Sequence, residues 1–442
     1  MDLLISGGLL VTMDPEFRII EDGAIAVEGD TISAIGKRAD LEGRIRAAKT
    51  IDARGAIIMP GMINGHMHAA MSLFRGVAED RSLDDWLRNY IFPAEARNVT
   101  EDFVLWGTRL GVLEMLRGGV TCYADMYYFE DTVAQVTKEA GMRGVLGETI
   151  LDFPAPDNKS PDAALAYCEK YIDKWKGDPL VTPAVAPHSI YTASNDTLIK
   201  TAELARRKGV PILMHIAEAP FETELSRARH GGSPVHFLET FGFLGPDVVG
   251  AHCVWLDAAD IATLLKRRVG TVHNPSSNMK LASGIMPVVQ LLHAGVPVGL
   301  GTDSAAANNN QDLFQEMNLA AKLQKVSRMD PRALTARETV EMATIGGARA
   351  LHMEGKIGSL ETGKQADIVL IGLGATHSTP MYDVYSQLVY ALNAHDVLTV
   401  VIAGKIVMEV RVMYTMDKPL ILAKAHEYQR KVAASLIAPP PV

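Results

Sequence analysis

Eight short apolar runs that alternate with segments of helical periodicity constrain this chain more than any other feature of its sequence. The runs are rich in β-branched residues and have the length of buried strands. They are residues 57–63, 119–123, 143–150, 181–186, 210–216, 248–254, 269–272 and 296–300. Eight buried strands alternating with helices predict an α/β fold, a (β/α)8 barrel of the TIM type.

The segments between these runs repeat their apolar residues with the period of a helix, and several carry helix-boundary signals. Ser194 and Asp257 are suited to cap helix N-termini, and Gly209 and Gly295 follow the last periodic residues. The predicted helices are residues 102–117, 131–140, 161–175, 194–208, 258–266 and 286–294. A doubly wound open sheet is the alternative, but no Gly-x-Gly-x-x-Gly sequence follows a strand, which argues against it.

Both ends of the chain have a different sequence pattern, with short apolar runs separated by turn signals. Residues 1–58 contain four such runs, and the same pattern returns over residues 355–418. The first segment alone is too small to be stable, so we expect the two to form one small β-sandwich domain. The barrel of residues 59–354 is then inserted into it, and residues 419–442 form a C-terminal helix and tail.

The 442-residue chain is ordinary in composition for a soluble globular enzyme, with 48% hydrophobic and 21% charged residues. Its net charge of -9 and its lack of a basic run argue against binding to nucleic acid or to a membrane surface. No apolar stretch is long enough to span a membrane, and the N-terminus lacks the features of a signal peptide. Three widely spaced cysteines indicate no disulfide framework, so we expect a cytoplasmic protein.

The first barrel strand ends in two histidines, His66 and His68, that are one residue apart. On an extended strand such residues point to the same side, so both imidazoles can face one point. Two converging neutral imidazoles form half of a transition-metal site. The remaining ligands must then come from the ends of other strands.

Further polar residues follow the other strands at the end where barrel enzymes place their chemistry. They are Asp125, His188, His215, Glu218, His252, His273 and Asp303. We expect His66, His68, His215 and Asp303 to bind one metal ion, with a solvent molecule completing its shell. These ligands suit Zn²⁺, which lowers the pKa of bound water toward neutral pH, and they suit Fe²⁺ as well.

Hydrolysis also needs a proton shuttle that is not itself a metal ligand. Glu218 lies three residues after His215, so it could reach both the water molecule and a leaving nitrogen. His252 could orient the water, and Asp303 could act as both ligand and base. Two-metal barrels of this type need a bridging Lys at the end of the fourth strand, where this chain has His188, so a mononuclear site is expected.

Several longer segments of the chain carry a family resemblance. They are PGMINGHMHAAMSLFRGVAED, HIAE, GAHCVWL, HNPSSNMKLASGI, LGTDSAAANNNQDLFQEM and, near the C-terminus, GKIGSLETGKQADIVLI. With these segments the chain resembles the amidohydrolase superfamily over essentially its whole length. Within that superfamily it is most similar to the 5-methylthioadenosine/S-adenosylhomocysteine deaminase family. The resemblance implies the same four metal ligands.

The resemblance also implies substrate contacts at Glu95, His188 and Glu218. Glu95 would accept hydrogen bonds from both ribose hydroxyls of a nucleoside. Some family members carry a substrate-contacting Arg at the end of the third strand, whereas this chain has Glu148 at about that place. Because a Glu cannot bind a substrate carboxylate, 5'-modified adenosines with neutral tails are favoured over S-adenosylhomocysteine.

The implied reaction is hydrolytic deamination of an adenosine derivative, in which Glu218 carries a proton to ring N1 and ammonia leaves from C6. An alternative is a deaminase or dechlorinase of another N-heterocycle, such as guanine, an oxidised purine, a pterin or an s-triazine. A non-catalytic barrel is a third hypothesis, but every ligand and the shuttle acid are present in the sequence. The resemblance implies a homodimer or homotetramer that binds a small-molecule nucleoside.

Overall fold

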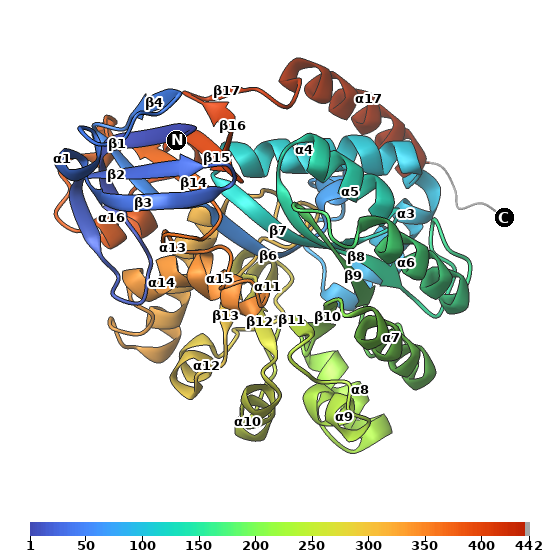
Figure 1. Cartoon of the computed structure of the whole chain (residues 1–442). Coiled ribbons are helices and arrows are strands. Elements are labelled where there is room, and N and C mark those ends of the chain that lie inside the picture. The colour runs from blue at the N-terminus through green and yellow to red at the C-terminus, as the bar shows by residue number, and fades with distance from the viewer. Residues whose placement is uncertain (438–442) are drawn as a thin grey trace.

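The computed structural model describes residues 1–437 and divides its strands between two sheets (Figure 1). The first sheet contains eight parallel strands in their order along the chain. They are β6 (Met62–Met67), β7 (Val120–Tyr127), β8 (Arg143–Ile150), β9 (Val181–Pro187), β10 (Ile212–Ile216), β11 (Val248–His252), β12 (Gly270–His273) and β13 (Val298–Leu300). The backbone N–H of Asp303, just after β13, donates to the His66 carbonyl over 3.0 Å and brings the last strand against the first. The predicted barrel is therefore confirmed.

Six helices of the barrel lie within two residues of the predicted segments (Figure 1). They are α4 (Glu101–Arg117), α5 (Glu130–Glu139), α6 (Pro161–Trp175), α7 (Asn195–Lys208), α10 (Ala258–Arg267) and α12 (Val288–Ala294). The predicted cap at Ser194 is present, because its side chain accepts a hydrogen bond from the Thr197 N–H. Six further helices follow β10 along the chain, namely α8 (Pro220–His230), α9 (Pro234–Thr240), α11 (Pro275–Lys280), α13 (Leu313–Arg328), α14 (Ala336–Ala343) and α15 (Ile345–Ala350).

The second sheet is built from both ends of the chain, as predicted, and hydrogen bonds join its nine strands. They are β1 (Leu3–Val11), β2 (Ile19–Glu28), β3 (Thr31–Lys37), β4 (Lys49–Asp52), β5 (Ala56–Pro60), β14 (Ile368–Gly372), β15 (Val397–Ile402), β16 (Lys405–Glu409) and β17 (Val412–Met413). Antiparallel pairing of β5 with β14 joins the two halves. Ile5 and Ile25 from the first half share one buried core with Leu370 and Val401 from the second. Short helical segments accompany it: α1 (Arg38–Leu41), η3 (Thr376–Ser378), α16 (Val384–Tyr390) and η4 (Ala394–Asp396).

One predicted strand, residues 57–63, is divided in the structure between the two sheets. Residues 57–60 belong to β5 in the terminal sheet, and the barrel strand β6 begins at Met62. The chain crosses at Gly61, whose N–H donates to the Asp367 carbonyl over 3.0 Å. A Cβ at Gly61 would lie 2.0 Å from Thr121 Oγ1, so only glycine fits this crossing. The pairing of the terminal sheet thus extends two residues past the expected boundary at residue 58, and the division into domains stays a prediction.

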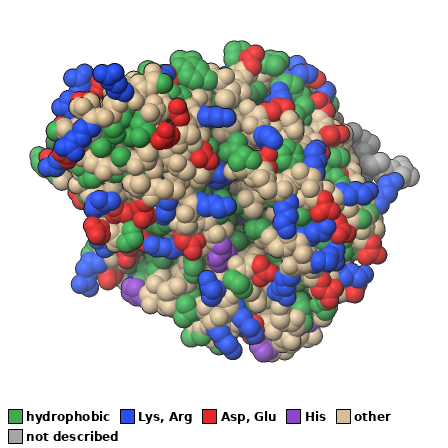
Figure 2. All heavy atoms as spheres, viewed as in Figure 1, with side chains coloured by type: hydrophobic (Ala, Val, Ile, Leu, Met, Phe, Trp, Pro, Cys, Tyr) green, Lys and Arg blue, Asp and Glu red, His purple; other side chains and the backbone are tan. Residues whose placement is uncertain are grey.

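The C-terminal helix α17 (Lys418–Ile437) packs along α4, where Tyr428 Oη donates to Asp102 Oδ2 over 2.5 Å (Figure 1). The predicted tail at residues 438–442 lies outside the described residues. Within residues 1–437, no helix has the length and hydrophobicity that crossing a membrane requires. Figure 2 shows Lys and Arg interspersed with Asp and Glu on the face viewed, which agrees with the absence of a basic run in the sequence.

Candidate active site

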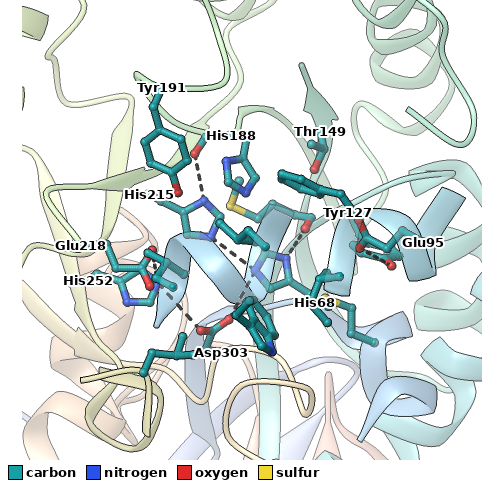
Figure 3. A pocket seen from close by; sticks show the side chains of 18 of the residues that line it. His68, Glu95, Tyr127, Thr149, His188, Tyr191, His215, Glu218, His252 and Asp303 are labelled. Atoms are coloured by element: carbon teal, nitrogen blue, oxygen red, sulfur yellow. Dashed lines mark hydrogen bonds and ion pairs between the residues drawn. The ribbon is translucent and has the colours of Figure 1, made fainter. Parts of the chain in front are cut away.

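Side chains from the carboxyl ends of three barrel strands converge with Asp303 at one point (Figure 3). His68 Nε2 lies 3.4 Å from Asp303 Oδ1, and His66 Nε2 lies 3.7 Å from the same oxygen. His215 Nε2 lies 3.4 Å from His68 Nε2. His252 belongs to the same cluster, because one nitrogen each from His66, His215 and His252 lie within 4.8 Å of one another. The structure therefore brings together the four predicted metal ligands and His252.

Local backbone geometry permits this convergence at the seam of the barrel. A Cβ at Gly301 would lie 2.8 Å from the His66 carbonyl oxygen and 2.4 Å from Asn274 Oδ1. Glycine thus lets the chain after β13 approach β6 closely. Asp303 follows in the left-handed region with a φ of 59°, which Asp tolerates better than most residues. Ser277 Oγ donates to Asp303 Oδ2 over 2.6 Å and fixes the carboxylate.

The imidazoles are held in the orientation that metal binding requires. His215 Nδ1 lies 2.9 Å from the His188 carbonyl oxygen, and His68 Nδ1 lies against the Met126 carbonyl oxygen. A carbonyl accepts a hydrogen bond only from a protonated Nδ1, so in the neutral ring the lone pair is on Nε2, which faces the cluster. His66 Nε2 is buried and has no hydrogen-bond partner among the described residues. Nitrogen and carboxylate donors arranged in this way fit a divalent transition metal.

Glu218 lies beside this cluster, just beyond the end of β10. The Glu222 carboxylate fixes the turn by accepting the N–H groups of Ala217 and Glu218 over 3.1 and 2.8 Å. Glu218 Oε2 lies 3.8 Å from His252 Nε2, whose ring is held by a 2.8 Å contact between Nδ1 and Asn278 Oδ1. Burial raises the pKa of Glu218 well above its ordinary value, which suits a group that takes up and returns a proton.

A pocket of about 530 Å³, which includes its open mouth, extends from the cluster toward the segment that joins β6 to α4. This segment contains η1 (Ala69–Phe74), α2 (Leu83–Asp85), a π-helical turn η2 (Trp86–Ile91) and α3 (Phe92–Asn98). It covers the pocket with apolar side chains, which are Met71, Leu83, Trp86, Leu87, Ile91 and Phe92. An apolar pocket with a few convergent polar groups is typical of a site for a small organic molecule.

Glu95 and His188 supply polar groups at the wall of this pocket (Figure 3). Glu95 Oε1 accepts a hydrogen bond from Tyr127 Oη over 2.8 Å, and Oε2 accepts one from Tyr128 Oη over 3.3 Å. Burial raises the pKa of Glu95 to about 7, although both tyrosine hydroxyls oppose the rise. Burial lowers the pKa of His188 to about 3, so its imidazole is neutral and suited to hydrogen bonding with an uncharged ring.

Glu148 is a predicted substrate-binding residue that does not line the pocket. Its carboxylate accepts hydrogen bonds from the Glu130 N–H over 3.1 Å and from Asn158 Nδ2 over 3.0 Å. Successive side chains of a strand face opposite sides, and the next residue, Thr149, lines the pocket instead. The pocket lining therefore gives no support to a contact between Glu148 and the substrate, which stays a prediction. No Lys or Arg within residues 1–437 lines this pocket.

The sequence reasoning missed the aromatic groups at the pocket wall. Tyr127 and Tyr128 both line it, as do Trp86 and Tyr191. A usable signal was present, because the two tyrosines follow Asp125 at the end of the second strand, where functional side chains are expected. Trp86 and Tyr191 lie in segments between a strand and a helix, where no periodic pattern distinguishes a pocket residue from a core residue.

Comparisons with known proteins agree with this geometry. The model of the amidohydrolase family matches residues 57–407. A 5-methylthioadenosine/S-adenosylhomocysteine deaminase of Syntrophus aciditrophicus is 45% identical over 439 residues, which cover 99% of each chain. A 5'-deoxyadenosine deaminase of Methanosarcina acetivorans is 40% identical, again over 99% of each chain.

A solved structure is also similar to this chain. An adenosine deaminase of Xanthomonas campestris, crystallised with bound zinc, superimposes with a TM-score of 0.96 at 39% identity. The match covers 98% of this chain and 99% of that one. Fold and sequence therefore agree along nearly the whole chain. The chain belongs to the amidohydrolase family.

Proposed function

We propose that this chain is a metal-dependent hydrolytic deaminase that converts 5'-modified adenosines to the corresponding inosine analogues and ammonia. One observation carries the proposal. A single pocket has the histidine–aspartate cluster and Glu218 at one end, and a buried carboxylate, Glu95, on its wall. The cluster and Glu218 suit hydrolysis, and Glu95 suits the binding of a ribose. The names of the similar deaminases support the same substrate class.

His66, His68, His215 and Asp303 would hold one Zn²⁺ per subunit, with Fe²⁺ as the rival. The buried, unpartnered Nε2 of His66 supports a bound ion, because an orphaned imidazole nitrogen is costly in a protein interior. When bound, the metal lowers the pKa of a coordinated water molecule toward neutrality. A bridging lysine is missing where His188 stands, which supports a single ion.

The protein's own groups would do the rest of the chemistry. Glu218 would take the proton of the attacking water and deliver it to N1 of the ring as the new bond forms at C6. His252, held by Asn278, would orient the water with Asp303. The amino group would then take the second proton of the water and leave from C6 as ammonia, so that one water is consumed and a C=O bond replaces the C–NH₂ bond. His188 would hydrogen-bond the base, and Glu95 would accept the ribose hydroxyls.

Metal dependence gives the first prediction. The purified chain is expected to contain about one zinc or iron ion per subunit by elemental analysis. Removal of the ion with a chelator should abolish ammonia release and lower the thermal midpoint, because an ion that binds only the folded state stabilises it. Readdition of zinc should restore both. A chain without a stoichiometric transition metal that still releases ammonia would exclude the proposed mechanism.

Glu95 gives the second prediction, which separates a nucleoside deaminase from an enzyme for a free heterocycle. Glu95→Ala should lower kcat/KM for 5-methylthioadenosine by about 100-fold or more, because two hydrogen bonds to a charged acceptor are lost. The spectrophotometric assay should include guanine and s-triazines as alternative substrates. If the variant deaminated 5-methylthioadenosine as fast as the unchanged protein, the enzyme would not be built for ribosides.

The 5' substituent gives the third prediction. The pocket is apolar and its lining contains no Lys or Arg within residues 1–437, so a zwitterionic tail would find no cation there. Lys280 and Arg81 line a second pocket that shares Leu83 and Leu281 with this one. Both are already paired, with Glu79 over 2.6 Å and Asp85 over 3.7 Å. We expect kcat/KM to be about tenfold or more lower for S-adenosylhomocysteine than for 5-methylthioadenosine or 5'-deoxyadenosine. Equal kcat/KM values for these substrates would contradict the prediction, because the zwitterionic tail would then need no cation in the pocket.

The oligomeric state and the cellular location stay predictions. A homodimer or homotetramer is implied by the sequence resemblance, and sedimentation analysis of the purified protein would distinguish these states from a monomer. A cytoplasmic location is expected from the composition, and cell fractionation would test it.

A further inference from the structure

Tyr127 and Tyr128 are consecutive residues, yet both hydroxyls contact the carboxylate of Glu95. Consecutive residues of a regular strand face opposite sides, so only one of them would normally reach it. Here β7 ends at Tyr127, and Phe129 lies in the left-handed region with a φ of 55°. The chain therefore turns after the strand, and the two rings lie side by side with their centroids 4.7 Å apart.

Two carboxylates hold the turn, of which Glu148 is buried and Asp157 is half-buried. A left-handed conformation is unfavourable for a bulky residue such as Phe129 and persists only where its surroundings fix it. Asp157 Oδ2 accepts the Phe129 N–H over 2.7 Å, and Glu148 Oε2 accepts the Glu130 N–H over 3.1 Å. Glu148, which does not reach the pocket, thus helps to fix the turn that carries Tyr128.

The tyrosines leave Glu95 able to bind a diol. An ionised carboxylate has about four acceptor positions, and each oxygen of Glu95 uses one for a tyrosine. Each oxygen therefore retains capacity for another donor. Both tyrosines and Glu95 line the pocket, and all three are buried. Two donors on two different oxygens also fix the plane of the carboxylate.

We propose that Tyr127 and Tyr128 are positioning residues that hold Glu95 as a two-point acceptor for the neighbouring 2' and 3' hydroxyls of a riboside. This inference rests on the proposed nucleoside deaminase function. The tyrosines act through Glu95, and they leave the hydrolytic groups at the metal-binding cluster unchanged. Their removal should therefore affect recognition of the sugar and have little effect on turnover.

The test is the ratio of kcat/KM for adenosine to kcat/KM for 2',3'-dideoxyadenosine, measured in the metal-loaded enzyme. Tyr127→Phe and Tyr128→Phe should each lower this ratio by about tenfold, mainly through KM for adenosine. A general structural disturbance would lower both values and leave the ratio unchanged. In a Glu95→Gln background, the same tyrosine substitutions should cause no further change in the ratio.

Tyr171→Phe is the matched control, because it removes a buried tyrosine hydroxyl that donates to the Leu146 carbonyl over 3.1 Å outside the pocket. It should leave the ratio as in the unchanged protein. An unaltered ratio in both Tyr127→Phe and Tyr128→Phe would overturn the inference, and so would a full effect that persists in the Glu95→Gln background. If the unchanged enzyme deaminated no nucleoside at all, the proposed function itself would fail.

Discussion

Glu218→Gln is expected to lower kcat for 5-methylthioadenosine by about 10²–10⁴-fold, the usual contribution of a general acid–base group. The amide keeps the shape of the side chain but can neither take up nor return a proton. Glu218 must be ionised to take the proton of the water, and burial raises its pKa, so kcat/KM should fall as the pH drops through that pKa. The variant should lose this acidic limb of the pH profile. Steady-state ammonia release over a range of pH checks both effects.

Two measurements separate this chemical effect from damage to the site. Metal content should be the same in Glu218→Gln as in the unchanged protein, since Glu218 is not a predicted ligand. Glu316→Gln is a matched control at a buried carboxylate outside the pocket, where the side chain accepts from the Ser276 N–H over 3.0 Å. Its kcat should change less than about tenfold. A Glu218→Gln enzyme within threefold of the unchanged kcat would rule out the proposed proton shuttle.

The parts of this molecule that local sequence determines could be predicted. The barrel follows from the eight apolar runs, because a buried strand and an amphipathic helix each leave a periodic pattern. The cluster of His66, His68, His215 and Asp303 follows from position, since the carboxyl ends of all barrel strands meet at one face. These side chains do converge in the structure. Predicting this required only the order of the strands and of the polar residues that follow them.

The parts that depend on tertiary contacts could not be predicted. The change of sheet at Gly61 is set by the close approach of Thr121, a residue 60 positions away in the chain. Glu148 and Thr149 differ by one position, and only the phase of β8 decides which of them faces the pocket. Tyr128 lies just past the end of β7, at a turn where Phe129 adopts a left-handed conformation that the sequence does not signal.

A buried ion pair between Arg143 and Asp367 is the site of the largest expected effect on stability. Arg143, at the start of β8, donates from Nε and Nη2 to the two carboxylate oxygens of Asp367 over 2.9 and 3.1 Å. Both side chains are only 3% exposed. Asp367 also accepts the Ala403 N–H over 2.8 Å, so the pair joins the barrel to the terminal sheet.

Asp367→Asn should destabilise the folded protein by about 3–5 kcal/mol, because a buried guanidinium is left without its counter-charge. Urea denaturation of the metal-loaded enzyme, followed by circular dichroism, would measure the loss. Arg54→Met removes a matched but exposed ion pair with Asp52, whose side chains are 73% and 57% exposed, and should leave the midpoint nearly unchanged.

The double replacement Arg143→Met with Asp367→Leu tests the cause of that loss. If the single variant is unstable because one charge stays buried and unpaired, removal of both charges should restore most of the stability. The stability of the double variant should stay below that of the unchanged protein, because two backbone groups lose their partners. These are the Ala403 N–H and the Pro179 carbonyl, and the latter accepts from Arg143 Nη1 over 2.8 Å. If the double variant were as unstable as Asp367→Asn, the contacts of these backbone groups, and not the buried charge, would hold the barrel to the terminal sheet.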